Sequence, residues 1–195
     1  STLTRSAANT YTGGTTVNAG TIKLSVSNAI TGSSVVVNSG GNITNGGAHG
    51  ILGSSVNLTV NGGTFNIGGY TEQLTTVTMT DGSLLGNGSG NNYYVTGGWT
   101  LAGNNTITGG IDMRTAYSNS GLFNVTSGTT TISGTVANVV NQQSLTKNGS
   151  GTLVLSGNNT YTGGTTLNNG TLVLSGNNTY YGGTTLNNGT LVLNS

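Results

Sequence analysis

The chain has 195 residues, a formal net charge of +1 and only 4% charged residues, against about 25% in an average soluble protein. So little charge gives no long-range field that would attract nucleic acid or an anionic membrane, so we expect neither as a partner. No apolar stretch approaches the roughly 20 residues of a membrane span, which argues against membrane insertion by this segment. The chain contains no Pro and no Cys. It is rich in Gly, Thr and Val, a composition that favours strands and glycine turns over disorder.

Residues 1–25 contain a regular repeat unit. Thr2–Gly20 reads TLTRSAANTYTGGTTVNAG and is followed by TIKLS. Apolar and polar residues alternate with a period of two, which is typical of a strand with one buried face. We therefore expect Ile22 to point inward and Lys23 to point outward.

The middle of the chain, residues 26–144, has the same texture with looser spacing. Alternating segments such as VVVNSGGNI and VNLTVNGGTFNI are separated by glycine pairs, which predicts further strands joined by tight corners. A trace of the repeat, NNTITGG, runs from Asn104 to Gly110.

Three aromatic residues of this irregular part are candidates for a ligand surface. Tyr93, Tyr94 and Trp99 lie close together in the sequence. If they are exposed, they could contact a sugar or a protein partner. If they are core residues, they need no such role.

Residues 145–195 are near-identical repeats with a period of 19. Thr152–Gly170 reads TLVLSGNNTYTGGTTLNNG, Thr171–Gly189 differs from it by one residue, and a third copy begins at Thr190. The second position of the unit is apolar in every copy, whereas the third position is Lys23 in the copy that begins at Thr21. We expect the inward side chains to be those of Leu153, Leu155, Leu172, Leu174 and Leu191, with Val154 and Val173 outward.

These repeats decide the architecture, because a 19-residue unit is too short for a pair of helices and cannot bury its own apolar face. Coiling the units as hydrogen-bonded layers buries a thin continuous core. The prediction is an all-β chain, residues 1–195, that forms a single-stranded parallel β-helix, or β-solenoid, with layers of about 19–22 residues. Like residues should then stack on like, as with Tyr161 on Tyr180 and Asn168 on Asn187.

The segments Leu145–Ser175 and Ala8–Leu24 resemble the autotransporter-associated β-strand repeat of bacterial autotransporter passenger domains. The resemblance implies a right-handed parallel β-helix that is exported through the outer membrane and serves as a stalk or an adhesive rod. It also implies an extracellular or bacterial cell-surface location. The chain begins with Ser and shows no leader, so we expect a processed product or a fragment.

The residues that could support catalysis or metal binding are few. The acids are Glu72, Asp81 and Asp112, and the one histidine is His49. Glycosidase chemistry needs two facing carboxylates, and a zinc site needs several His or Cys ligands. We therefore expect no enzyme, no metal and no cofactor, and interpret Glu72 and Asp81 as surface loop charges rather than as a catalytic pair.

The two ends of the chain are candidates for self-assembly. Leu3 and Arg5 lie in the first unit, and Leu191 and Leu193 lie in the last. The last unit, TLVLNS, contains no charged residue and no proline that would protect its edge. Exposed strand edges can dock onto another chain, and a head-to-tail contact generates an open fibre. Arg5 occupies a position that is leucine in later copies, where its charge could either prevent stacking or reach the next subunit.

Three functions stay open at this point. The first is a structural rod, as a surface stalk or a filament subunit, whose partners would be copies of itself or other cell-surface components. The second is an adhesin that presents a binding surface. The third, an ice-binding surface, would use recurring Thr-x-Thr pairs such as Thr10/Thr12, Thr106/Thr108 and Thr160/Thr162. The near-identical repeats favour the rod.

Overall fold

The computed structural model describes residues 1–87, 93–113, 121–138 and 142–194, and the strands in them form three sheets. The first sheet has ten strands: β1 (Thr2–Arg5), β3 (Gly20–Leu24), β5 (Gly41–Asn45), β7 (Thr64–Asn66), β10 (Ser83–Leu85), β13 (Asn105–Ile107), β16 (Thr129–Ile132), β19 (Thr152–Leu155), β21 (Thr171–Ser175) and β23 (Thr190–Asn194). The second has nine: β2 (Thr15–Val17), β4 (Ser34–Asn38), β6 (Asn57–Asn61), β9 (Thr76–Thr80), β12 (Trp99–Ala102), β15 (Leu122–Val125), β18 (Leu145–Asn148), β20 (Thr165–Leu167) and β22 (Thr184–Leu186). The third has four: β8 (Glu72–Leu74), β11 (Tyr93–Val95), β14 (Ile111–Asp112) and β17 (Val136–Ala137).

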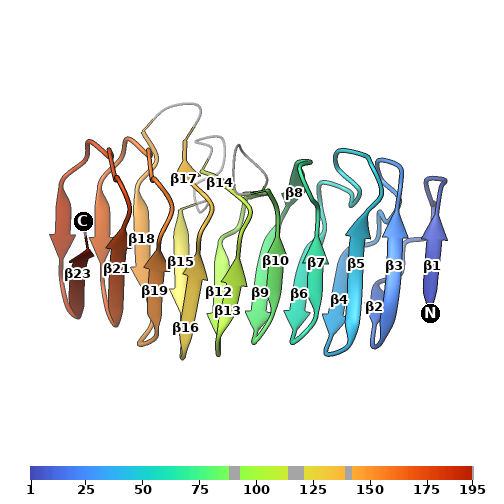
Figure 1. The fold of residues 1–195 in the computed structure, drawn as a ribbon, viewed down its shortest axis with the longest axis horizontal. Coiled ribbons are helices and arrows are strands. Elements are labelled where there is room, and N and C mark those ends of the chain that lie inside the picture. The colour runs from blue at the N-terminus through green and yellow to red at the C-terminus, as the bar shows by residue number, and fades with distance from the viewer. Residues whose placement is uncertain (88–92, 114–120, 139–141, 195) are drawn as a thin grey trace.

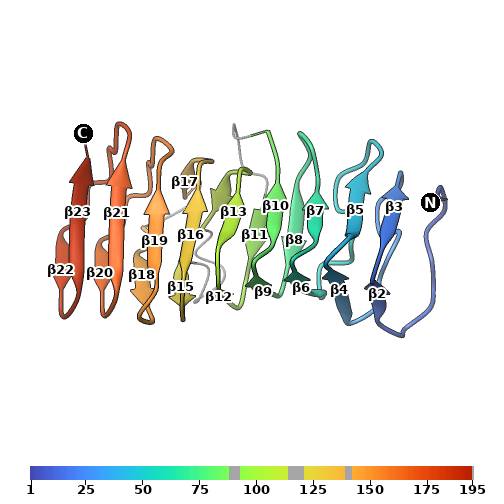
Figure 2. The same ribbon diagram turned by 60° about the horizontal axis from the view of Figure 1, so that its bottom comes forward.

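The chain coils into an elongated β-solenoid. Each pair of neighbouring strands in these sheets is parallel. The layers follow one another in chain order, with the N-terminus and the C-terminus at opposite ends (Figures 1 and 2). This confirms the predicted all-β solenoid.

The layers differ in length more than the sequence suggested. In the regular repeats Thr152 pairs with Thr171, so the step is 19 residues, whereas Thr106 pairs with Thr131, a step of 25. The expected range of about 19–22 therefore holds at the ends and is too short for the middle. The connections absorb the difference, because parallel pairing fixes the strands in register and leaves the turns free to lengthen.

The core lies between the sheets and is made of inward-facing aliphatic side chains. Leu153, Leu155 and Leu172 are fully buried, Leu174 is nearly so, and Val154 on the opposite face is half-buried. Other predicted positions follow the same pattern: Val173 is half-buried, Lys23 is exposed, and Ile22 and Leu191 are partly buried against the core. The predicted inward and outward faces are confirmed.

Identical side chains stack along the rod, as predicted. The rings of Tyr161 and Tyr180 are parallel, with centroids 5.0 Å apart and an interplanar angle of 2°. Asn187 Nδ2 donates to Asn168 Oδ1 at 2.7 Å, and Asn168 Nδ2 donates to Asn148 Oδ1 at 2.8 Å. These ladders add hydrogen bonds and ring contacts to the pairing of the backbone.

The four-stranded sheet gives the solenoid a third face, which the sequence did not predict. Beyond its strands the third face continues through single contacts, such as the bridge between Ile30 and Leu52 and the hydrogen bond from Thr160 N to Val136 O at 3.0 Å. Its strands have only two or three residues. It is here that the surface is hollowed.

Candidate functional site

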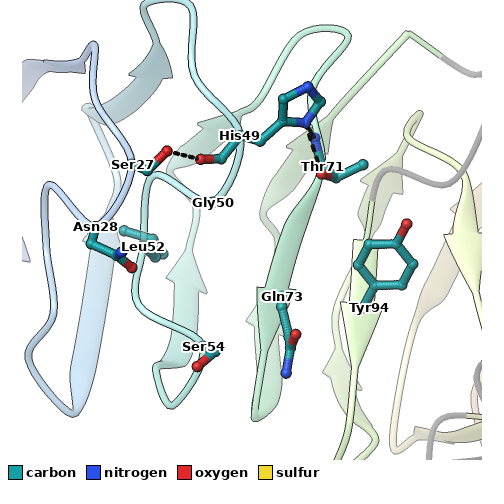
Figure 3. A pocket seen from close by; sticks show the side chains of 9 residues that line it. All are labelled: Ser27, Asn28, His49, Gly50, Leu52, Ser54, Thr71, Gln73 and Tyr94. Carbon is teal, nitrogen blue, oxygen red and sulfur yellow. Dashed lines mark hydrogen bonds between the residues drawn. The ribbon is translucent and has the colours of Figure 1, made fainter.

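A shallow hollow of about 300 Å³ lies on the third face, beside β8 and β11. Consecutive layers supply its walls, with Ser27 and Asn28 on one side and Tyr94 on the other (Figure 3). No charged side chain lines it. The lining residues are Ser27, Asn28, His49, Gly50, Leu52, Ser54, Thr71, Gln73 and Tyr94.

The imidazole of His49 is held in one orientation at the rim of this hollow. Its Nδ1 lies 2.8 Å from Thr71 Oγ1 and 3.2 Å from the backbone nitrogen of Thr71. A backbone N–H can only donate, so Nδ1 accepts, and the neutral ring carries its proton on Nε2. The ring also makes an edge contact with Tyr70, with centroids 5.1 Å apart. His49 thus offers Nε2 as a fixed donor.

Gln73 and Tyr94 stand side by side along the opposite wall. They are paired residues on adjacent strands, β8 and β11, and both are half-buried. An amide and a phenol in register, together with the imidazole, give a neutral surface that can hydrogen-bond and stack. Such a surface suits a neutral polar molecule such as a sugar better than an ion.

A buried carboxyl lies directly under the hollow. Glu72 is 1% exposed, and the backbone N–H of Leu52 lies 3.3 Å from both of its carboxyl oxygens. Burial raises the pKa of Glu72 from 4.5 to about 8, so the group is protonated at neutral pH. The Tyr93 phenol on the next strand donates to Leu85 O at 2.9 Å, and burial raises its pKa well above the usual value.

The acids do not come together as a catalytic pair. Glu72 is in the core on β8, whereas Asp81 lies in the turn between β9 and β10, where its Oδ1 accepts from Asn104 N at 2.8 Å. Asp112 on β14 is also buried. The interpretation of the pair as surface charges is therefore wrong for Glu72, and it fits Asp81, which is exposed.

Two of the three aromatic residues considered for a ligand surface are in the core. Tyr93 is fully buried, and Trp99 is 2% exposed and stacks on Phe123 with centroids 5.6 Å apart. Among the described residues, Trp99 Nε1 is the buried side-chain polar atom without a hydrogen-bond partner. Of the three, Tyr94 alone is accessible, and it belongs to the hollow.

The family comparison explains the repeated layers. The passenger-associated-transport-repeat family matches residues 1–24, 96–112, 145–174 and 169–193. The chain carries passenger-associated-transport-repeats. This confirms the resemblance to autotransporter passenger domains seen in the sequence. No curated protein and no solved structure matches the chain.

The middle passenger-associated-transport-repeat is in a different register from the one that NNTITGG suggested. Asn104–Gly110 contains strand β13 of the ten-stranded sheet, whereas the similar letters at 158–164 form the connection between β19 and β20. The better equivalent is Thr96–Gly98, TGG, which precedes β12 as the TGG at 162–164 precedes β20. Thr106 and Thr108 accordingly lie at strand β13 of the ten-stranded sheet, whereas Thr10/Thr12 and Thr160/Thr162 lie in the connections before β2 and β20.

The four self-assembly candidates lie in the first and last layers. Leu3 is 56% exposed in the first layer, and Leu193 is 64% exposed in the last, with Leu191 partly buried. Arg5 is engaged within its own layer, because its guanidinium bonds Asn9 Oδ1 and lies 5.5 Å from the ring centre of Tyr11. Stacking between chains stays a prediction.

Sequence reasoning missed Lys147, a lysine buried inside a repeat layer. Its side chain is fully buried on β18, and Nζ donates to the carbonyl oxygens of Asn148 and Gly149, each at 2.8 Å, and of Asn169 at 3.1 Å. Burial lowers its pKa from 10.5 to about 8. The alternation in Leu145–Thr146–Lys147, with leucine inward, was the signal that could have revealed it.

Two further observations bear on the kind of site that the described residues can form. They contain no group of three or more His, Cys, Asp or Glu side chains placed to hold a metal ion. Nor does that part of the chain contain a helix with the length and apolar character of a membrane crossing.

Proposed function

We propose that the chain is an extracellular structural rod, the stalk of an autotransporter passenger at the bacterial surface, without catalytic activity of its own. One observation carries the proposal: a ten-stranded parallel sheet runs through the chain, and the passenger-associated-transport-repeats supply its first and last strands. Each layer contacts its neighbours, so the fold supplies length rather than a deep site.

Small-angle X-ray scattering tests the rod shape, and adhesion measurements test whether the role is purely structural. Ten strands at about 4.8 Å give a rod roughly 45 Å long, which small-angle X-ray scattering can distinguish from a sphere of the same mass. Beads coated with the chain should bind cells and glycans no better than uncoated beads. A spherical particle would contradict the rod, and strong, saturable binding would contradict a purely structural role.

An adhesin is the second candidate, and the hollow beside His49 favours it. The neutral lining of hydroxyl, amide, imidazole and phenol groups suits a neutral glycan. If the chain is an adhesin, Gln73→Ala and Tyr94→Ala should each abolish glycan binding. The exposed Thr185 on β22 provides the matched control, because Thr185→Ala changes a distant face.

Head-to-tail stacking would be a third form of the rod, and the exposed Leu3 and Leu193 favour it. Sedimentation at increasing concentration tests it, with Leu193→Lys as the variant. Stacking predicts concentration-dependent assembly that the lysine abolishes. A monomer at every concentration, or equal assembly of both chains, would rule out this contact.

A further inference from the structure

The turns between layers contain several Asn-Gly pairs, and their geometry differs. Such a pair can close a succinimide ring when the glycine nitrogen attacks Cγ of the asparagine. The described pairs are Asn45–Gly46, Asn61–Gly62, Asn148–Gly149, Asn169–Gly170 and Asn188–Gly189. Two structural features decide which of them is poised to react.

The first feature is the approach of the glycine nitrogen to the asparagine side chain. Gly170 N lies 2.8 Å from Asn169 Oδ1, and Gly189 N lies 3.0 Å from Asn188 Oδ1. Both contacts fold the side-chain amide back toward the nucleophile, and both glycines have positive φ, 76° and 109°. Reacting atoms held in this way react faster than freely rotating ones.

The second feature is the Lys147 ammonium. Its Nζ donates to Asn169 O at 3.1 Å, and this carbonyl belongs to the peptide group whose nitrogen is that of Gly170. When Gly170 N loses its proton, negative charge spreads onto Asn169 O, beside the ammonium. A fixed cation where charge develops lowers the barrier.

We infer that Asn169–Gly170 is a site of spontaneous covalent modification, at which Gly170 N closes a succinimide on Asn169 and Lys147 promotes the closure. Gly170 N gives its proton to solvent base and bonds to Asn169 Cγ. The bond from Cγ to the side-chain nitrogen breaks, and that nitrogen leaves as ammonia. Water then opens the ring at either carbonyl, so the net reaction is asparagine plus water to aspartate or isoaspartate plus ammonia.

The product would change this layer of the rod. A carboxylate replaces a neutral amide next to Lys147. An isoaspartate adds a backbone methylene between β20 and β21, each of which pairs in register with strands of the neighbouring layers. Gly170 packs closely on the preceding layer, because a Cβ added there would lie 2.4 Å from Gly151 O. The modification therefore converts a regular turn into an irregular, negatively charged one.

The other pairs act as internal controls. Asn188–Gly189 has the same close approach but lacks the lysine. Leu167, which pairs with Lys147 in the next layer, stands where a lysine would have to be to reach Asn188 O. Asn148 O also accepts from Lys147, but Asn148 Oδ1 is engaged by Asn168 Nδ2 in the ladder. In the remaining pairs Gly46 N and Gly62 N donate to the backbone carbonyls of other layers.

Peptide mapping by mass spectrometry tests the inference. The full folded chain is incubated in H₂¹⁸O at neutral pH, below the pKa of about 8 of Lys147, so that the lysine stays charged and conversion during the experiment labels the new acid. Asn169 should convert about tenfold faster than Asn188 or Asn148, the change that a weak charge-assisted hydrogen bond supplies. Asn45 and Asn61 should be slowest.

Two comparisons make the test decisive. Lys147→Met should slow Asn169 to the rate of Asn188 and leave Asn188 unchanged. In denaturant, where both pairs share the sequence Asn-Asn-Gly-Thr-Leu-Val-Leu, their rates should be equal, which gives a reference even if the variant folds poorly. Equal rates of Asn169 and Asn188 in the folded chain, or an unchanged ratio in a folded Lys147→Met variant, would overturn the inference.

Discussion

Glu72 is a buried titratable residue whose pKa is strongly shifted. Its carboxyl is almost fully buried, and burial raises its pKa from 4.5 to about 8. Between these values the folded chain binds a proton that the unfolded chain has lost, so raising the pH favours unfolding. The contribution of Glu72 to the free energy of unfolding should be fully present below about pH 4.5 and should fall by a few kcal/mol as the pH rises to about 8. Denaturant titrations across this range measure it.

Glu72→Gln is the matched control, because it keeps the size and polarity of the side chain and removes the titration. Other groups near Glu72 are Tyr93, whose raised pKa keeps it neutral in this range, and His49 at the rim of the hollow. Both are present in each chain, so the difference between the two stability curves reports Glu72 alone. Parallel curves would show that Glu72 is not buried in solution.

At the residue scale, the sequence predicted the aliphatic faces and missed the buried polar groups. For Tyr93, Tyr94 and Trp99 the sequence left exposed and core positions open, and the structure buries Tyr93 and Trp99 and leaves Tyr94 half-buried. The failures, Glu72 and Lys147, come from the general rule that charged residues lie on the surface. Carbonyls from turns, among them that of Asn169, satisfy Lys147, and such a distant partner cannot be read from local sequence.

Strand β21 tests the core. Leu172 is fully buried between its partners Leu153 and Leu191 in the neighbouring layers. Leu172→Ala should lower the free energy of unfolding by about 2–5 kcal/mol, because it removes buried methyl groups and leaves a cavity. Val173→Ala on the outward face of the same strand should cost less than about 1 kcal/mol. Equal costs in chemical denaturation would contradict the assignment of faces.

The connection between β19 and β20 tests a hydrogen bond that recurs in the repeats. Tyr161 Oη lies 2.6 Å from Thr165 Oγ1, and both side chains are fully buried. Tyr161→Phe leaves the Thr165 hydroxyl without this partner, so thermal unfolding should show a loss of about 1–3 kcal/mol.

Tyr11 is the internal control for that bond. Its hydroxyl makes the same contact with Thr15, at 2.5 Å, in a partly exposed layer. Solvent can replace the lost bond there, so Tyr11→Phe should cost less than about 0.5 kcal/mol. If Tyr11→Phe is as costly as Tyr161→Phe, burial does not set the strength of this contact.

At the scale of elements, the two long sheets were predictable and the third was not. The inward leucines of β19 and β21 repeat every 19 residues, so their pairing follows from the sequence. Strands β14 and β17 have two residues each, ID and VA, which share no pattern with β8 or β11. Strands of two or three residues are too short for alternation to be recognised, so the hollow beside β8 and β11 could not be placed either.

For the whole molecule, the identical repeats mean that stability and length should grow layer by layer. Leu172 and Leu174 pair with leucines on both sides, so an inserted copy finds the same neighbours. Four further copies of Thr171–Gly189, inserted after Gly189, should lengthen the rod by about 19 Å at about 4.8 Å per layer. The cross-section should stay constant, and the resistance to denaturant should rise as interfaces between layers are added.

Small-angle X-ray scattering measures this lengthening, and a scrambled insertion of the same composition is the control. The scrambled segment lacks the inward leucines at every second position, so it should give a disordered loop and a larger, more flexible particle. If the faithful copies give the same scattering profile as the scrambled ones, each repeat depends on more than its two neighbours, and the rod does not grow by simple addition of layers. A constant cross-section with added length would show that one 19-residue sequence contains all that a layer needs.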